Sequence, residues 1–107
     1  MFEVKAKIWL ELDSKGVIGE GRAELLHKIK ELGSLSEVAK QMGMAYSHAW
    51  SEIKEISDVV GCPIITAKRG GKDGGRSVLT EEGEEVLKRF DEEKKNMNRY
   101  LAKRNKE

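Results

Sequence analysis

Apolar side chains alternate with other residues at the start of the chain. Every even position from Phe2 to Leu12 is apolar, and most odd positions between them are charged. A period of two is typical of a strand with one buried face, so this stretch predicts a strand. Asp13-Ser14-Lys15-Gly16 then predicts a turn and Val17-Ile18 a short returning strand. We expect an N-terminal strand pair within residues 1–20.

Apolar positions then recur three and four residues apart, which predicts three helices within residues 22–60. The first helix is expected from about Arg22 to Leu32, with Gly33 as its stop. The second follows at once, because Ser34 and Glu37 have the spacing of a capping box. Its expected buried positions are Leu35, Val38, Ala39 and Met42.

The third helix is expected from about Ala45 to Val60, after a turn that contains Gly43. Its expected inward positions are Tyr46, Ala49, Trp50, Ile53 and Ile56. We expect Trp50 to be a core residue that fixes the third helix against the first. Two helices joined by a short glycine-containing turn predict a helix-turn-helix, whose second helix enters the DNA major groove.

Two short strands follow within residues 64–79, separated by four glycines and three charged residues over 70–76. Such a segment cannot pack a core and predicts the exposed tip of a β-hairpin, the wing. Thr80 is placed to cap a last helix over residues 80–104. The expected fold is α+β, mostly α: a winged helix-turn-helix with an N-terminal strand pair and a long C-terminal helix. With no internal repeat or linker, we expect one domain over residues 1–107.

The charge distribution changes this picture more than the net charge of +1 does. Residues 61–80 carry four Lys or Arg and one Asp, whereas residues 1–60 carry eight basic and ten acidic side chains. Positive charge is therefore concentrated in the wing, as expected for phosphate contact. The lone Cys62 cannot form an internal disulfide, and no apolar run reaches the length of a membrane span, so we expect a cytoplasmic protein.

The residues also match a family in their order along the chain. The matching segments are Gly19-Glu20-Gly21-Arg22, Gly33-Ser34-Leu35-Ser36, Ala39-Lys40, Gly43-Met44, Tyr46, Ala49-Trp50, Arg69-Gly70-Gly71-Lys72 and Leu79-Thr80-Glu81-Glu82-Gly83. They resemble the N-terminal DNA-binding domain of the molybdate-responsive ModE regulators, which is itself similar to the LysR-type winged helix. The resemblance implies a homodimeric, sequence-specific transcriptional regulator that is not an enzyme.

Three departures from that family pattern bear on what the resemblance implies. ModE proteins carry a C-terminal molybdate-binding region, whereas this chain stops after one helix, so we expect no molybdate-binding domain of its own. Ser47 and His48 stand where the family often has two arginines, which changes the expected phosphate contacts and base preference. Ala45 replaces the usual serine and removes a helix cap worth about 1 kcal/mol.

The candidate DNA contacts lie at the start of the third helix, at the cap of the second and on the wing. They are Ser34, Ala45, Tyr46, Ser47, His48, Ser51, Arg69, Lys72 and Arg76. Side chains of the first turn of a recognition helix reach base edges, and basic side chains of the wing contact phosphates. Tyr46 is expected to be mostly core, with its hydroxyl near a phosphate.

The last helix predicts a seam for pairing with a second copy of the chain. Positions 87, 90, 94, 97 and 101 follow alternating steps of three and four, and all are apolar (Leu87, Phe90, Met97 and Leu101) except Lys94. Leu87 and Phe90 could equally pack within their own domain, whereas Met97 and Leu101 lie farther along the helix than a small core can cover. We therefore expect a homodimer in which Met97 and Leu101 contact the partner.

Other classes of function fit the sequence less well. The Gly70–Gly75 loop lacks the ending of a phosphate-binding P-loop, and His27, His48 and Cys62 have no ligand-like spacing. We expect no cofactor, no metal and no catalytic residue. Two alternatives remain: a winged-helix module that binds protein, favoured by the near-neutral third helix, and a regulator that depends on a separate effector-binding protein.

Overall fold

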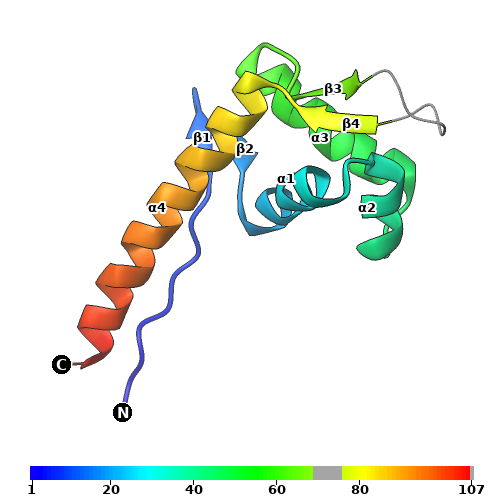
Figure 1. Cartoon of the computed structure of the whole chain (residues 1–107). Coiled ribbons are helices and arrows are strands. Elements are labelled where there is room, and N and C mark those ends of the chain that lie inside the picture. The colour runs from blue at the N-terminus through cyan, green and yellow to red at the C-terminus, as the bar shows by residue number, and fades with distance from the viewer. Residues whose placement is uncertain (69–75, 107) are drawn as a thin grey trace.

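The computed structural model of the chain describes residues 1–68 and 76–106, and the side chain of Lys68 lies outside that description. The elements in chain order are β1 (Leu10–Leu12), β2 (Lys15–Ile18), α1 (Glu20–Leu32), α2 (Leu35–Gln41), α3 (Tyr46–Val60), β3 (Ile65–Lys68), β4 (Arg76–Leu79) and α4 (Glu81–Lys106). The α+β, mainly helical architecture is confirmed: a strand pair, three helices, a β-hairpin and a long helix (Figure 1).

One hydrophobic core joins the three short helices to β2 and to the first half of α4. Its centre is α1, whose Leu25, Leu26 and Ile29 are fully buried or nearly so. Val38 of α2 and Ile56 of α3 contribute to the same cluster. α1 therefore presents one apolar side to the elements that surround it, as the spacing of its apolar residues at three and four positions predicts.

The N-terminal strand is much shorter than the alternation predicts, and that expectation is wrong for residues 2–9. β2 has four residues and pairs only with Leu10–Leu12, so the earlier residues extend past its end without a strand partner. They run beside α4 instead (Figure 1). Val4 exchanges backbone hydrogen bonds with the Asn105 side chain, at 2.9 Å from its N–H and 3.1 Å to its carbonyl.

The hairpin of β3 and β4 is held to the helices by backbone contacts at both ends. Ser77 N–H donates to the Gly33 carbonyl at 2.9 Å, which fixes β4 against the end of α1. Thr80 N–H donates to the Ile64 carbonyl at 2.9 Å, and the Thr80 hydroxyl donates to the Pro63 carbonyl at 2.7 Å. The same hydroxyl oxygen accepts from Gly83 N–H at 3.1 Å and so caps α4, as predicted.

Gly83 is where α4 approaches β3 most closely. A Cβ built on Gly83 would lie 2.2 Å from the Ile64 carbonyl oxygen, which is a backbone atom and cannot rotate away. Gly83 is also buried. Only a residue without a side chain allows the first turn of α4 to pack on this carbonyl.

α4 begins in the core and continues beyond it as an arm. Leu87 and Phe90 are buried, whereas the exposed Tyr100 lies near the far end. Three exposed ion pairs tie α1 to the first half of α4: Glu20 with Lys94, His27 with Asp91 and Lys30 with Glu84. The molecule is consequently elongated, with extents of 55 × 30 × 21 Å (Figure 1).

Replacing Gly83 with Ala is expected to destabilise the chain by about 1–3 kcal/mol, because the added methyl group must displace backbone. Gly21→Ala is the matched control: Gly21 lies in α1 with open space around its Cβ position. That change is expected to stabilise by about 0.5–1 kcal/mol, since alanine favours helix. Urea unfolding at one fixed protein concentration measures both, and equal effects of the two variants would contradict the close packing at Gly83.

Candidate nucleic-acid interface

The turn between α2 and α3 is fixed by local backbone geometry. Ser34 caps α2, because its hydroxyl oxygen accepts from Glu37 N–H at 3.2 Å. Gly43 adopts a φ of 66°, and Met44 N–H then donates to the Ala39 carbonyl at 2.9 Å. Ala45 precedes α3 without a side-chain cap, as its methyl group dictates. This arrangement sets the direction in which α3 leaves the turn.

The buried side of α3 is narrower than the sequence predicts. Ala49, Ile53 and Ile56 are buried as expected, but Trp50 is 46% exposed and Tyr46 is 52% exposed. The expected core position of Trp50 is therefore wrong, and so is that of the Tyr46 ring. Both residues lie at the margin of the apolar stripe, where the core is already closed by smaller side chains.

Helical geometry places the two aromatic residues together. Tyr46 and Trp50 are four residues apart, so they are neighbours on one flank of α3. Ser47 and Ser51 are each one position further along and are exposed on the outer side of the helix. The structure thus brings three candidate residues, Tyr46, Ser47 and Ser51, together with Trp50 onto one exposed surface of α3.

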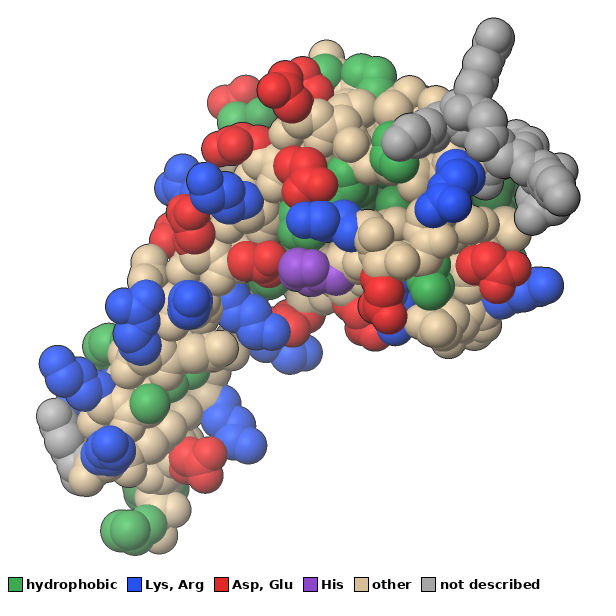
Figure 2. Space-filling model, in the orientation of Figure 1, with side chains coloured by type: hydrophobic (Ala, Val, Ile, Leu, Met, Phe, Trp, Pro, Cys, Tyr) green, Lys and Arg blue, Asp and Glu red, His purple; other side chains and the backbone are tan. Residues whose placement is uncertain are grey.

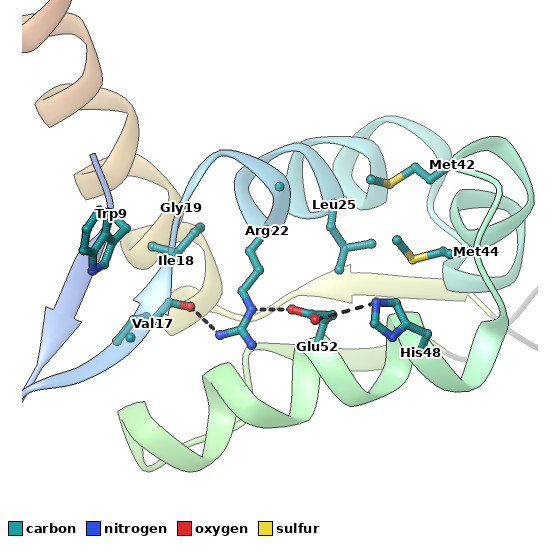
Figure 3. Close-up of a pocket in the computed structure, with 12 residues that line it drawn as sticks. Trp9, Val17, Ile18, Gly19, Arg22, Leu25, Met42, Met44, His48 and Glu52 are labelled. Carbon is teal, nitrogen blue, oxygen red and sulfur yellow. Dashed lines mark hydrogen bonds and ion pairs between the residues drawn. The ribbon is translucent and has the colours of Figure 1, made fainter. Parts of the chain in front are cut away.

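The opposite flank of α3 is occupied by ion pairs. Arg22 of α1 donates from Nε to Glu52 at 2.5 Å and from Nη1 to the Val17 carbonyl at 3.0 Å, and it also pairs with Glu55. His48 lies 3.7 Å from the other oxygen of Glu52 (Figure 3). Two carboxylates face one guanidinium here, so acidic groups outnumber basic ones on this flank.

A cavity of about 420 Å³ lies behind that flank, between the β1–β2 hairpin and the turn of the helix-turn-helix. Trp9, Met42 and Met44 contribute apolar walls, and Arg22 and His48 line the same cavity (Figure 3). His48 therefore lies beside the cavity and Glu52, away from the surface that carries Tyr46 and Trp50.

The wing residues differ in how far the structure describes them. Arg76 starts β4, and its guanidinium lies over the junction of α1 and α2, since a Cβ on Gly33 would be 2.7 Å from Nη2. Arg69 and Lys72 lie outside the described residues, so their expected phosphate contacts stay predictions. The described base of the wing is formed by four paired positions, from Ile65 with Leu79 to Lys68 with Arg76.

Features of other functional classes are absent from the described part of the chain. Within residues 1–68 and 76–106, no three His, Cys, Asp or Glu side chains are grouped in a way that could hold a metal ion. None of the helices in these ranges is both long and apolar enough to cross a membrane.

The fold and the exposed surface of α3 define a class: a winged helix-turn-helix domain of the kind that DNA-binding regulators use. The chain belongs to the lysR family of bacterial regulatory helix-turn-helix proteins, whose family model matches residues 22–84. The likeness to ModE regulators expected from the sequence is confirmed by similarity to proteins of that name over 82 residues of this chain.

Two similar proteins illustrate the match. The molybdenum-pterin-binding protein MopB of Rhodobacter capsulatus is 37% identical over 70 residues, which are 65% of this chain and 26% of MopB. The DNA-binding transcriptional dual regulator ModE of Escherichia coli K12 is 34% identical over 82 residues, 77% of this chain and 31% of ModE. The chain thus spans about a third or less of the length of these relatives.

A solved structure shows the same fold. The crystal structure of the BenM DNA-binding domain with its catB site 1 DNA superposes with a TM-score of 0.57 at 16% identity. The match covers 81% of this chain and 92% of the BenM chain, so the two share their fold over nearly the whole of the BenM domain.

Replacing Arg22 with Ala is expected to destabilise the chain by about 1–3 kcal/mol, because the half-buried Glu52 carboxylate and the Val17 carbonyl lose their donor. Glu55→Gln removes only the exposed end of the network and is expected to cost less than about 1 kcal/mol. Thermal unfolding of both variants measures the difference, and an Arg22→Ala protein as stable as Glu55→Gln would show that the network does not hold α3.

Proposed function

We propose that this chain binds double-stranded DNA sequence-specifically as a homodimer and acts as a transcriptional regulator in the cytoplasm. The observation that carries the proposal is the exposed side of α3, where Tyr46, Ser47, Trp50 and Ser51 form one surface. Hydroxyl groups and apolar rings are side chains that contact base edges, and a helix fits the major groove.

The remaining candidate residues have roles around that helix. Ser34 and Ala45 are the residues directly before α2 and α3 and would contact DNA from the starts of these helices. Arg69, Lys72 and Arg76 of the wing would neutralise flanking phosphates and give affinity on any sequence. Base contacts from α3 would then decide among sequences.

The homodimer is supported by the arm that α4 forms. The radius of gyration is 15.9 Å, compared with about 13 Å for a compact chain of this length. Leu87 and Phe90 are buried in their own core, so the contact with a partner falls to Met97 and Leu101, which are half-buried. Exposed Phe2 and Val4 lie on the segment that runs beside this arm (Figure 1).

Charge along α4 supports one arrangement of the two copies. Residues 81–93 carry seven Asp or Glu and two Lys or Arg, whereas residues 94–106 carry six Lys or Arg and no acidic side chain. Basic side chains gather over the distal arm in Figure 2. Acidic side chains near the N-terminus of α4 and basic ones near its C-terminus also complement the dipole of each helix by itself. Two α4 helices packed antiparallel would place each basic half against an acidic half.

A module that binds protein is the second candidate, and one observation favours it. α3 carries three acidic side chains and one lysine, so its own charge opposes DNA phosphates. A regulator that receives its effector signal from a separate protein is compatible with either candidate.

The test is selection of bound fragments from genomic DNA by the purified chain, followed by a salt titration on the best fragment. Enrichment of an inverted repeat with half-sites about one helical turn apart is expected for a dimeric regulator. Uniform, strongly salt-dependent binding would contradict sequence specificity. If nothing binds even at low salt, the chain is the protein-binding module.

Replacing Leu101 with Asp is expected to convert the dimer to a monomer at tens of micromolar, because a carboxylate in an apolar seam loses its hydration. Ala102→Asp adds the same charge one position away, on an exposed part of the arm outside the seam, and is expected to leave the dimer intact. Sedimentation equilibrium measures both. A dimer that tightens with added salt would contradict the antiparallel charge arrangement.

A further inference from the structure

We propose that Trp50 and Tyr46 form an aromatic patch that contacts the C5-methyl groups of thymines in the major groove, and so make thymine a determinant of the preferred sequence. This inference rests on the proposed function and names the base chemistry that α3 recognises. It follows from where the structure places two aromatic rings that the sequence pattern assigns to the core.

The first step is the exposure of the two rings. Trp50 keeps 46% of its surface in contact with solvent and Tyr46 keeps 52%. The protein covers about half of each residue, and the other half is apolar surface left open to a partner. Large aromatic side chains exposed side by side on a helix indicate a contact surface more than a core margin, since their burial is worth several kcal/mol.

The second step is the charge on the two flanks of α3. His48, Glu52 and Glu55 lie on the flank that faces Arg22, and the carboxylates there would repel phosphates. Tyr46, Trp50 and the two outer serines carry no charge of their own, and the next side chain on this side of the helix, Lys54, pairs with Asp58 at 3.2 Å, so the side has no net charge. DNA that approaches α3 along the outer side would therefore tilt toward the aromatic flank.

The third step is the match between these side chains and the groove. Ser47 and Ser51 follow Tyr46 and Trp50 by one position each, so hydroxyl groups and rings alternate along the same length of helix. A serine hydroxyl bonds several bases and discriminates weakly, whereas the thymine methyl is the one apolar group that the major groove presents. An indole ring contacts such methyl groups without any hydrogen bond. Thymine is therefore the base that this patch can distinguish.

The test removes only the methyl groups. In the best DNA fragment from the selection, the thymines of one half-site and then of both are replaced with deoxyuridine, which keeps every hydrogen-bonding group. The native chain is expected to lose about fourfold in affinity for each methyl group that it contacts. Trp50→Ala is expected to bind the thymine fragment more weakly and to bind the two fragments almost equally.

Three variants make the result specific. Trp50→Phe keeps an aromatic ring and is expected to retain part of the preference for thymine. Tyr46→Phe keeps the ring without its hydroxyl and is expected to retain nearly all of it. Trp9→Ala removes the other exposed tryptophan, which lines the cavity behind the acidic flank of α3 and is not part of the aromatic patch, and is expected to leave the preference unchanged. Thermal unfolding checks that each variant is folded.

The outcomes separate this inference from the function on which it rests. Equal affinity of the native chain for thymine and deoxyuridine fragments overturns the inference, and so does a thymine preference that survives Trp50→Ala. Specific DNA binding remains established in both cases. A chain that selects no DNA overturns the proposed function and the inference together, and leaves the aromatic patch as a surface for protein.

Discussion

The close packing of the first turn of α4 on the Ile64 carbonyl is the constraint on which the arrangement of the other elements depends. Ile64 ends the connection from α3, and Thr80 begins α4, so their hydrogen bond closes the hairpin at its base. Gly83 then lies against the same carbonyl. Because the contact is between backbone atoms, it fixes the recognition helix, the wing and the arm relative to one another without depending on side-chain rotamers.

The order of the elements and the approximate limits of the helices could be predicted from the sequence, because local signals determine them. Gly33 ends α1 with a φ of 67°, Ser34 caps α2 and Thr80 caps α4, and each of these is visible in the residue pattern. The wing and the long helix follow from glycine content and charge. Such signals act within a few residues and need no knowledge of the tertiary structure.

The wrong expectations, for residues 2–9 and for the rings of Trp50 and Tyr46, concern which apolar residues are buried, and that depends on distant partners. Alternation in residues 2–9 predicts a strand, but β2 is too short to pair with it, and the segment bonds to Asn105 instead. Trp50 fits the apolar spacing of α3, but Ala49, Ile53 and Ile56 already fill the available contact with the core. Periodicity identifies a face within about 100°, and it cannot locate the edge of the buried stripe. The position of Trp50 at that edge is what makes it available for binding.

α3 has an acidic flank that faces α1 and an aromatic flank that faces solvent. The acidic flank connects the candidate interface, through α1, to the helix that would pair two copies. Arg22 joins the acidic flank of α3 to α1, and α1 is in turn joined to α4 by burial of Leu87 and Phe90 and by three exposed ion pairs. Exposed ion pairs contribute little individually, so the direction of the arm is set mainly by the buried side chains. If two arms pack antiparallel, that direction sets the distance between the two aromatic patches. The spacing of DNA half-sites is then a property of the core, whereas the choice of base is a property of the exposed flank.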